Sequence, residues 1–532
     1  PEIAPTTPTT PTPATPTAPA PAPPAAPTRV VGTVTIVPRN IFDPTAPGEN
    51  SRLFRFANRL HRTTRPEVIE RQLLFRSGDP FSSDVVRESE RMLRANSYFY
   101  DAQIRQTYAD QARVDLEVLT RDVWTLQGGL NFHRAGGTNA TTFEVEDGNF
   151  LGTGKDVTLA HHADIDRNSD FFRYRDPSLF STRARLEFHL ADNTDGRASL
   201  LSVERPFFSL DARWAAGITG LQDDRIDPLY ETGRIVSRFR HRRDFLELYY
   251  GTSPGFVDGS TDRFRFGFTY DRDLFSLAPR LTPPADLPRD RRLSYPWIAY
   301  QYIEDGFVTE HDLDRLQRTE DLNLGRQLKL RLGWSSPTLG GDRSRAVFVA
   351  SAADGWHPSA RQLVLTSTSA SGRYGRDGFE NSLVNGSLRY YARDFGNQTF
   401  YAALEGDFAH RLDRESQLLL GGDTGLRGYP LRFQDGNRRF LLTVEQRYYN
   451  DREYLHLVHL GAAAFFDAGR AWFAGASAAA GHALLKDIGI GLRLGSSRSS
   501  HGSVVHLDLA HPLNHLAGVR SLQWLVTTSE TF

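Results

Sequence analysis

Several residue types and patterns are missing from this 532-residue sequence, and each absence excludes a class of protein. Cysteine is absent, which excludes disulfide bonds, thiolate zinc sites and cysteine catalysis. An excess of one charge is also missing, since 63 basic against 64 acidic residues leave a formal net charge of −1. The sequence therefore gives no sign of binding nucleic acid or another polyanion.

Long hydrophobic runs are absent as well. No run of about 18 apolar residues occurs and the mean hydropathy is −0.44, so we do not expect a helical membrane protein. The sequence begins at Pro1 and its only methionine is Met92, so we expect any export signal to have been removed before Pro1.

The first 28 residues consist almost entirely of proline, threonine and alanine. Such a segment buries too little apolar surface to offset the entropy lost on ordering, so we predict a disordered linker over residues 1–28. A proline-rich ligand for another domain is the alternative interpretation.

Residues 29–122 have a mixed pattern that predicts one α+β domain in the order β-α-α-β-β. Residues 29–37 alternate as a strand, and residues 51–63 have close to helical spacing. Thr64 is a candidate helix cap before Pro66, and residues 82–96 form a further amphipathic helix. Two further segments alternate and are predicted to pair as strands: 98–108 and 112–120.

From residue 123 to residue 532 the sequence is a succession of short alternating segments. In residues 263–271, Phe264, Phe266 and Phe268 fall on one side and charged residues on the other. This alternation is typical both of a soluble sandwich and of a transmembrane barrel with a wet interior. Strands of about ten residues with aromatic ends favour the barrel, and about 25 residues per strand with its connection predict about 16 strands.

Several motifs, in order, resemble the outer-membrane insertase superfamily that includes BamA and TamA, and the related two-partner secretion translocators. The motifs are DGNFLGTGKDVTL at 147–159, LRGYP at 426–430, FFDAGRAWF at 465–473, DIGIGLRLG at 487–495 and HLDLAHPLN at 506–514. The resemblance covers nearly everything after residue 28. It implies a periplasmic POTRA-like domain at 29–122 and an outer-membrane barrel at 123–532.

The resemblance also implies a site inside the barrel. The LRGY residues are similar to the tip of a long sixth loop that folds into the lumen: Leu426, Arg427, Gly428 and Tyr429. The F-x-D-x-G strand motif is matched by Phe465, Asp467 and Gly469. Carried over by motif, Arg427 reaches Asp467, because a guanidinium can donate to both carboxylate oxygens. Glu445 falls on the polar side of its strand and is a second candidate acceptor.

The function implied by the resemblance is assembly or translocation of other proteins, with no enzymatic activity. Barrel strands 124–133, with Gly128 and Gly129, and 521–532, with Trp524 and Phe532, would form a weak seam, a lateral gate that templates client strands. The expected partners are unfolded outer-membrane or secreted proteins, outer-membrane lipids and periplasmic chaperones or accessory subunits. A secretion pore for one partner protein is the alternative, and a barrel enzyme or a passive pore is a third.

Other chemical motifs do not fit. GNFLGTGKD at 148–156 lacks the first glycine and the Ser/Thr of a phosphate-binding loop. Adjacent His161 and His162 point to opposite faces of a strand, and so do His456 and His459, so we expect no metal site. No nucleophile-elbow motif follows a strand, and no cofactor is expected.

Overall fold

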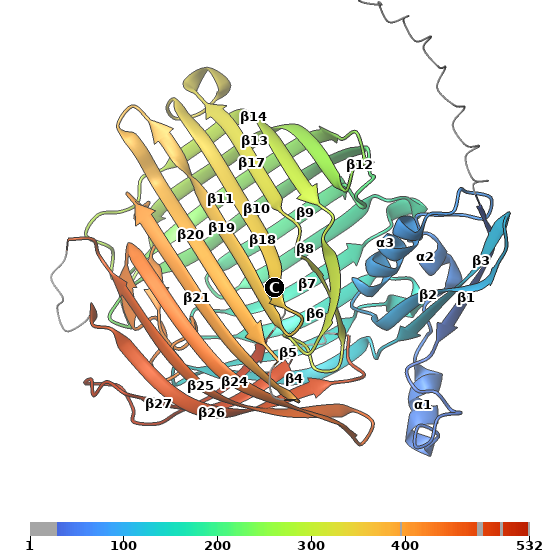
Figure 1. Ribbon diagram of the computed structural model, residues 1–532. Helices are drawn as coiled ribbons and strands as arrows, with labels where there is room; N and C mark the ends of the chain where they lie inside the picture. The colour runs from blue at the N-terminus through green and yellow to red at the C-terminus, as the bar shows by residue number, and fades with distance from the viewer. Residues whose placement is uncertain (1–28, 394–395, 476–481, 501–503, 530–532) are drawn as a thin grey trace, which may run out of the picture.

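A computed structural model describes residues 29–393, 396–475, 482–500 and 504–529, so the predicted linker and Phe532 lie outside the described residues. Figure 1 shows a large closed barrel with a small α+β unit beside one of its ends. None of the described helices is long and apolar enough to cross a membrane.

The unit at residues 29–122, called the N-terminal unit below, packs the second and third of its helices against a three-stranded sheet, while the first helix packs on Ile41 and Phe42 of the loop before it. Its elements are β1 (Val30–Arg39), α1 (Arg52–Leu60), α2 (Pro66–Glu70), α3 (Ser83–Arg94), β2 (Phe99–Ala109) and β3 (Arg113–Asp122). The sheet order is β1-β3-β2, in which β3 runs parallel to β1 and antiparallel to β2. Strand β2 is therefore an edge of this sheet.

Local sequence explains these helices. Ser51 and Ser82 cap α1 and α3 by accepting the main-chain N–H of Phe54 and Val85. Pro66 occupies the first turn of α2, where its missing N–H costs nothing. The predicted order with two helices was wrong, because the insertion after β1 forms α1, a helix of its own.

The barrel wall consists, in the described part of the chain, of twenty antiparallel strands. They are β4 (Leu126–Ala135), β5 (Thr138–Asp147), β6 (Asp156–Ala163), β7 (Asn168–Asp176), β8 (Arg185–Asn193), β9 (Gly196–Arg205), β10 (Trp214–Glu231), β11 (Arg234–Thr252), β13 (Ser260–Leu277), β14 (Arg291–Glu304), β17 (Gln327–Ser335), β18 (Arg345–Ser359), β19 (Gln362–Gly375), β20 (Gly378–Ala392), β21 (Gln398–His410), β24 (Arg438–Tyr454), β25 (Val458–Trp472), β26 (Leu485–Ser496), β27 (Val504–Pro512) and β28 (Gln523–Ser529). The two-residue β12 (Phe256–Val257) only extends the β13 edge.

The prediction of a closed antiparallel barrel is confirmed, and the prediction of about 16 strands was wrong. That number assumed about 25 residues for each strand with its connection. Many connections are tighter, such as the two-residue turn 232–233 between the long strands β10 and β11, so more strands fit the same length.

The outer surface of the barrel is apolar and the inner surface is polar. Phe266, Leu332 and Ile490 alternate with inward residues and expose 51%, 59% and 64% of their surface. Buried charges, among them Arg345, Asp467 and Arg493, point the other way. Exposed apolar side chains that alternate with inward polar ones are what a transmembrane barrel would present to lipid.

The two ends of the barrel differ. The near rim is the end beside the N-terminal unit, formed by turns 148–155, 177–184 and 455–457; the far rim carries turns 136–137 and 232–233. Contacts to the unit define the near rim: Arg183 donates to the main-chain oxygen of Leu73 at 2.8 Å. Loop 411–437, which holds the LRGY motif and the short strands β22 (Leu418–Leu420) and β23 (Gln434–Gly436), connects β21 to β24 at the far rim.

Candidate functional site

Arg427 lies at the centre of an ion cluster inside the barrel. Its Nε and Nη2 donate to the two Asp467 carboxylate oxygens at 2.7 and 2.8 Å, and Nη1 donates to Glu445 Oε1 at 2.6 Å. The guanidinium carbon lies 3.4 Å from the centre of the Phe465 ring. Burial would lower the pKa of Arg427, but the carboxylates of Asp467 and Glu445 raise it overall, so the arginine stays charged.

The rest of the LRGY motif fixes the loop to the wall. Leu426 and Tyr429 are fully buried, in a cluster with Leu441 of β24 and Leu485 of β26. The Tyr429 hydroxyl donates to the main-chain oxygen of Lys486 at 2.7 Å.

Three glycines lie where a side chain would not fit: Gly425 and Gly428 in the loop, and Gly469 on β25. Gly425 has φ +103°, a conformation that other residues rarely adopt, and a Cβ on Gly428 would lie 2.7 Å from Asp487 Cβ. Gly469 lies on β25 beside the loop, where a Cβ would meet the Phe440 oxygen at 2.9 Å. Arg427, Asp467, Glu445 and Phe465 therefore meet, with Gly469 and the other loop residues in support.

The loop that carries this motif is not the sixth of its side. Among the described strands it is the eighth far-rim connection, and five wall strands, β24 to β28, follow it. In a 16-stranded barrel, five strands would also follow the sixth connection of this side. The four strands beyond the predicted 16 therefore precede the loop.

Three further lumen charges belong to the cluster and were not predicted. Asp508 Oδ2 accepts from Arg427 at 3.3 Å, and Arg493 donates to Asp508 Oδ1 at 2.5 Å. Arg447 Nε donates to Glu445 Oε2 at 2.7 Å. Alternation places Arg447 on the face of Glu445 and Asp508 on an inner face, but only the strand register shows which side chains meet.

A second loop enters the lumen from the near rim. It connects β14 to β17 and contains the hairpin β15 (Phe307–His311) and β16 (Thr319–Asn323). Leu313, at the tip side of the hairpin, is buried against Leu363 and Tyr391 of the wall. The Leu313 oxygen accepts from Arg447 Nη1 at 2.8 Å, so this loop contacts the ion cluster from the near-rim side.

The same near-rim loop also holds the N-terminal unit. Arg94 of α3 donates to both carboxylate oxygens of Asp321, each at 2.7 Å. The Tyr100 hydroxyl donates to the Gln317 oxygen at 2.9 Å. A chain of direct contacts therefore connects α3, through loop 305–326 and Arg447, to Arg427.

The seam between the first and last wall strands is weakly paired. Strand β4 pairs with β5 along its whole length, from Leu126↔Asp147 to Ala135↔Thr138. In the described residues, β28 meets β4 at one register pair, Val526↔Arg134. Register pairs between described residues are therefore sparse at this junction.

The predicted seam residues lie as follows. Trp524 stacks on Phe132 with ring centres 6.0 Å apart, and the Arg134 guanidinium lies over the Trp524 ring. A Cβ at Gly128 or Gly129 would meet no atom within 4 Å, so crowding does not require glycine at either position. Strand β4 spans Leu126–Ala135, ten residues as predicted but two positions later, and β28 spans Gln523–Ser529 within the described residues.

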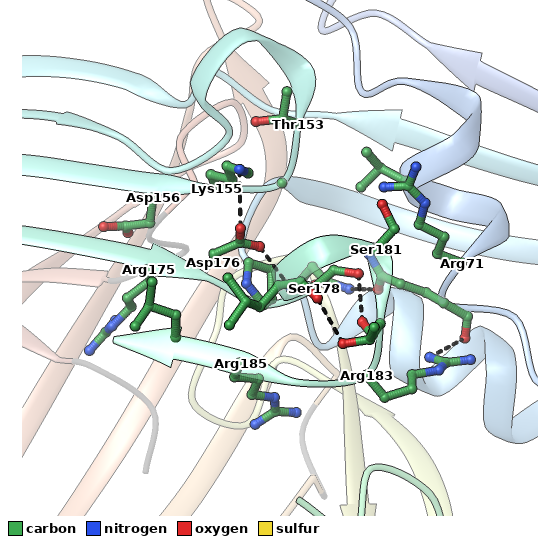
Figure 2. Close-up of a pocket in the computed structure, with 18 of the residues that line it drawn as sticks. Arg71, Thr153, Lys155, Asp156, Arg175, Asp176, Ser178, Ser181, Arg183 and Arg185 are labelled. Atoms are coloured by element: carbon green, nitrogen blue, oxygen red, sulfur yellow. Dashed lines mark hydrogen bonds and ion pairs between the residues drawn. The ribbon is translucent and has the colours of Figure 1, made fainter. Parts of the chain in front are cut away.

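A cavity of about 1450 Å³ lies at the near rim between α2 and the turns that follow β5 and β7. Figure 2 shows its side chains, with Lys155 directed at Asp176, 3.1 Å away. The lysine of the GNFLGTGKD segment thus lies in a turn between two strands and pairs with the last residue of β7. Phe180 at the cavity is 88% exposed.

The histidines in the described part of the chain do not gather into a metal site with one another. His161 lies 2.6 Å from Asp170, whereas His162 contacts Asp164. Within the described residues, Glu49, Glu453 and His456 lie close enough together to share an ion. Glu49, however, accepts from Arg498 at 2.7 Å, so arginine already neutralises this group.

Comparison with known proteins gives similar barrels at low identity. No protein-family model and no curated protein sequence matches the chain. The chain is similar to BamA from Haemophilus ducreyi lacking POTRA domains 1–3, at 14% identity over 93% of this chain and 84% of that one, with a TM-score of 0.39. The chain is also similar to CdiB from Acinetobacter baumannii, at 11% identity over 94% of this chain and 73% of that one, with a TM-score of 0.46. CdiB from Escherichia coli gives 13% identity over 93% and 76%, with a TM-score of 0.45.

Proposed function

We propose that this chain is an outer-membrane barrel that assembles client proteins by pairing their β-strands with an opened seam. The N-terminal unit would be a POTRA domain in the periplasm, and the near rim would face that compartment. The motifs at 426–430 and 465–473, together with the Arg427–Asp467 contact, support a place in the insertase and two-partner translocator superfamily.

The observation that carries the proposal is the junction of β4 and β28. A closed barrel offers no free strand edge, whereas a junction with one register pair among its described residues would open at small cost. An opened β4 would present unpaired N–H and C=O groups to an incoming strand, which is recognition by β-augmentation. The free edge strand β2 would hold an unfolded client in the same way before transfer.

A disulfide across the seam tests the proposal, because the chain has no native cysteine. The double variant Arg134→Cys/Val526→Cys joins the two residues that pair across the junction. The matched control Val505→Cys/Thr528→Cys places a disulfide between β27 and β28, inside the wall.

The measurement is insertion of an unfolded outer-membrane barrel into proteoliposomes that contain each variant. We expect the oxidised seam variant to lose insertion and to regain it on reduction, while the control remains active in both states. Full activity of the oxidised seam variant would refute the proposed gate.

Secretion of a partner protein through the lumen is the second candidate. Loop 411–437 and loop 305–326 enter the lumen from opposite ends, and their withdrawal would open a continuous path. The seam disulfide separates the two candidates, because a lumen route would tolerate it. Periplasmic chaperones or accessory subunits, as partners of the N-terminal unit, belong to either candidate.

A further inference from the structure

Helix α1 carries an exposed apolar stripe that the fold does not use. Leu53, Phe56 and Leu60 lie three and four residues apart, on one face of the helix, and expose 66%, 57% and 59% of their surface. Phe54 lies on a different face, where it stacks on Phe42 with ring centres 4.1 Å apart. The packing of α1 onto its unit is therefore complete without the stripe.

Arginines line the remaining arc of the helix, beside the apolar stripe. They are Arg52, Arg55 and Arg59, followed by Arg62 just beyond the helix end, and the segment 52–62 contains no acidic residue. All four are exposed. A short helix with an apolar stripe beside a row of arginines is typical of a helix that lies in a membrane surface.

The helix is held against the near rim. The Phe54 ring meets His456 edge-on at 6.2 Å, and its cluster includes Trp124, which precedes β4, and Leu457 of the β24–β25 turn. Glu49, just before α1, accepts from Arg498, two residues after β26, at 2.7 Å. Figure 1 shows α1 projecting from the N-terminal unit beside that end of the barrel.

We propose that α1 is an interfacial helix that docks onto the anionic phospholipid leaflet surrounding the near rim. Leu53, Phe56 and Leu60 would enter the boundary of the acyl chains, and the arginines would lie among lipid phosphates. Charge complementarity favours this occupant over a neutral surface, and the contacts to the rim keep the helix at the height of the leaflet. The docking rests on the barrel spanning a membrane, as proposed above, and it would hold the N-terminal unit beside the last strands.

Depth-dependent quenching tests the docking on the full chain, which allows single cysteines because it has none of its own. A fluorophore is attached at Phe56→Cys, and the protein is placed in vesicles of phosphatidylcholine and phosphatidylglycerol with brominated acyl chains. Leu332→Cys on the lipid face of β17 is the positive control, and Gln106→Cys on exposed β2 is the control outside the membrane.

We expect bromine quenching at Phe56→Cys and Leu332→Cys and none at Gln106→Cys. Changing the four arginines to glutamine should reduce quenching at Phe56→Cys at least twofold. Vesicles without phosphatidylglycerol should give the same reduction, while Leu332→Cys is unchanged in both experiments.

Quenching at Leu332→Cys without quenching at Phe56→Cys would overturn the docking and leave the barrel proposal intact. Shielding of Phe56→Cys by an added client protein, again without bromine quenching, would assign the stripe to a protein and overturn it equally. Quenching that ignores both the arginines and the anionic lipid would overturn the anionic specificity. Absence of quenching at Leu332→Cys would refute the membrane barrel itself.

Discussion

Arg447 of β24 donates to the main-chain oxygen of Leu313, 2.8 Å away, and so joins the barrel wall to the loop that enters from the near rim. The same guanidinium donates to Glu445, which also accepts from Arg427 of the far-rim loop. One residue of the wall thus bridges the two segments that occupy the lumen. A change in either loop can reach the other through two ion pairs.

Removing this bridge should loosen the near-rim loop. Arg447→Met abolishes the contacts to Leu313 and Glu445, and breaking a buried ion pair costs about 3–5 kcal/mol. We expect a several-fold higher open-channel frequency in planar bilayers and a lower temperature for the heat-induced mobility shift. Arg243→Met, which removes a lumen arginine paired with Asp271, is the control and should leave conductance unchanged. Equal conductance in both variants would contradict the bridge.

The two hydrogen bonds from the Arg427 guanidinium to Asp467 should stabilise the barrel beyond the effect of the positive charge alone. Arg427→Met leaves Asp467 buried without its cation and removes one of the cations that pair with Glu445 and Asp508, so we expect destabilisation of about 3–5 kcal/mol. Arg427→Lys keeps the charge but cannot donate to both Asp467 oxygens in the same plane, so its loss should be smaller. Thermal unfolding followed by gel mobility measures both.

The exchange Arg427→Asp/Asp467→Arg adds a pairwise test. Stability of the double variant should exceed that expected from adding the two single changes, because an opposite-charge pair is restored. Additive losses would show that the contact contributes nothing as a pair.

Alternation and motif order made the barrel predictable, whereas register and loop paths were not. The pattern of residues 263–271 reports which side chains face outward, and Phe264 and Phe266 are indeed exposed. It does not report the tightness of turns, and so the strand number was wrong. Loop 305–326 alternates like a wall segment, and its place in the lumen depends on distant partners such as Arg94 and Arg447.

Release of the near-rim loop should depend on pH through Glu320. This carboxylate accepts the main-chain N–H groups of Leu313, Asp314 and Arg315, yet burial, with a smaller contribution from Asp314, raises its pKa to about 7. Glu320 therefore holds its proton more tightly in the packed loop than in a released loop, where its pKa would be the ordinary 4.5. Protonation of Glu320 thus stabilises the packed loop. This stabilisation is complete below pH 4.5 and is lost as pH rises to about 7.

Conductance in planar bilayers should therefore rise between pH 5 and pH 7 and then level off. Glu320→Gln stays neutral throughout and should give a flat, low conductance over this range. The control Glu67→Gln changes an exposed residue of α2 and should keep the wild-type profile. A pH profile that survives Glu320→Gln would assign the titration to another group.

Amide hydrogen exchange should reveal the seam without any substitution. An amide exchanges when its hydrogen bond opens, and the free energy of local opening sets the protection. Strand β19 is paired on both sides along its length, whereas β28 is paired along its length with β27 and at Val526↔Arg134 with β4. In detergent micelles, peptides from 523–529 should therefore exchange at least tenfold faster than peptides from 362–375. The seam disulfide Arg134→Cys/Val526→Cys should slow exchange in 523–529 and leave 362–375 unchanged. Equal protection of the two peptides in the wild-type chain would mean that the junction is as firmly closed as the rest of the wall, and templating at β4 would then require a different opening.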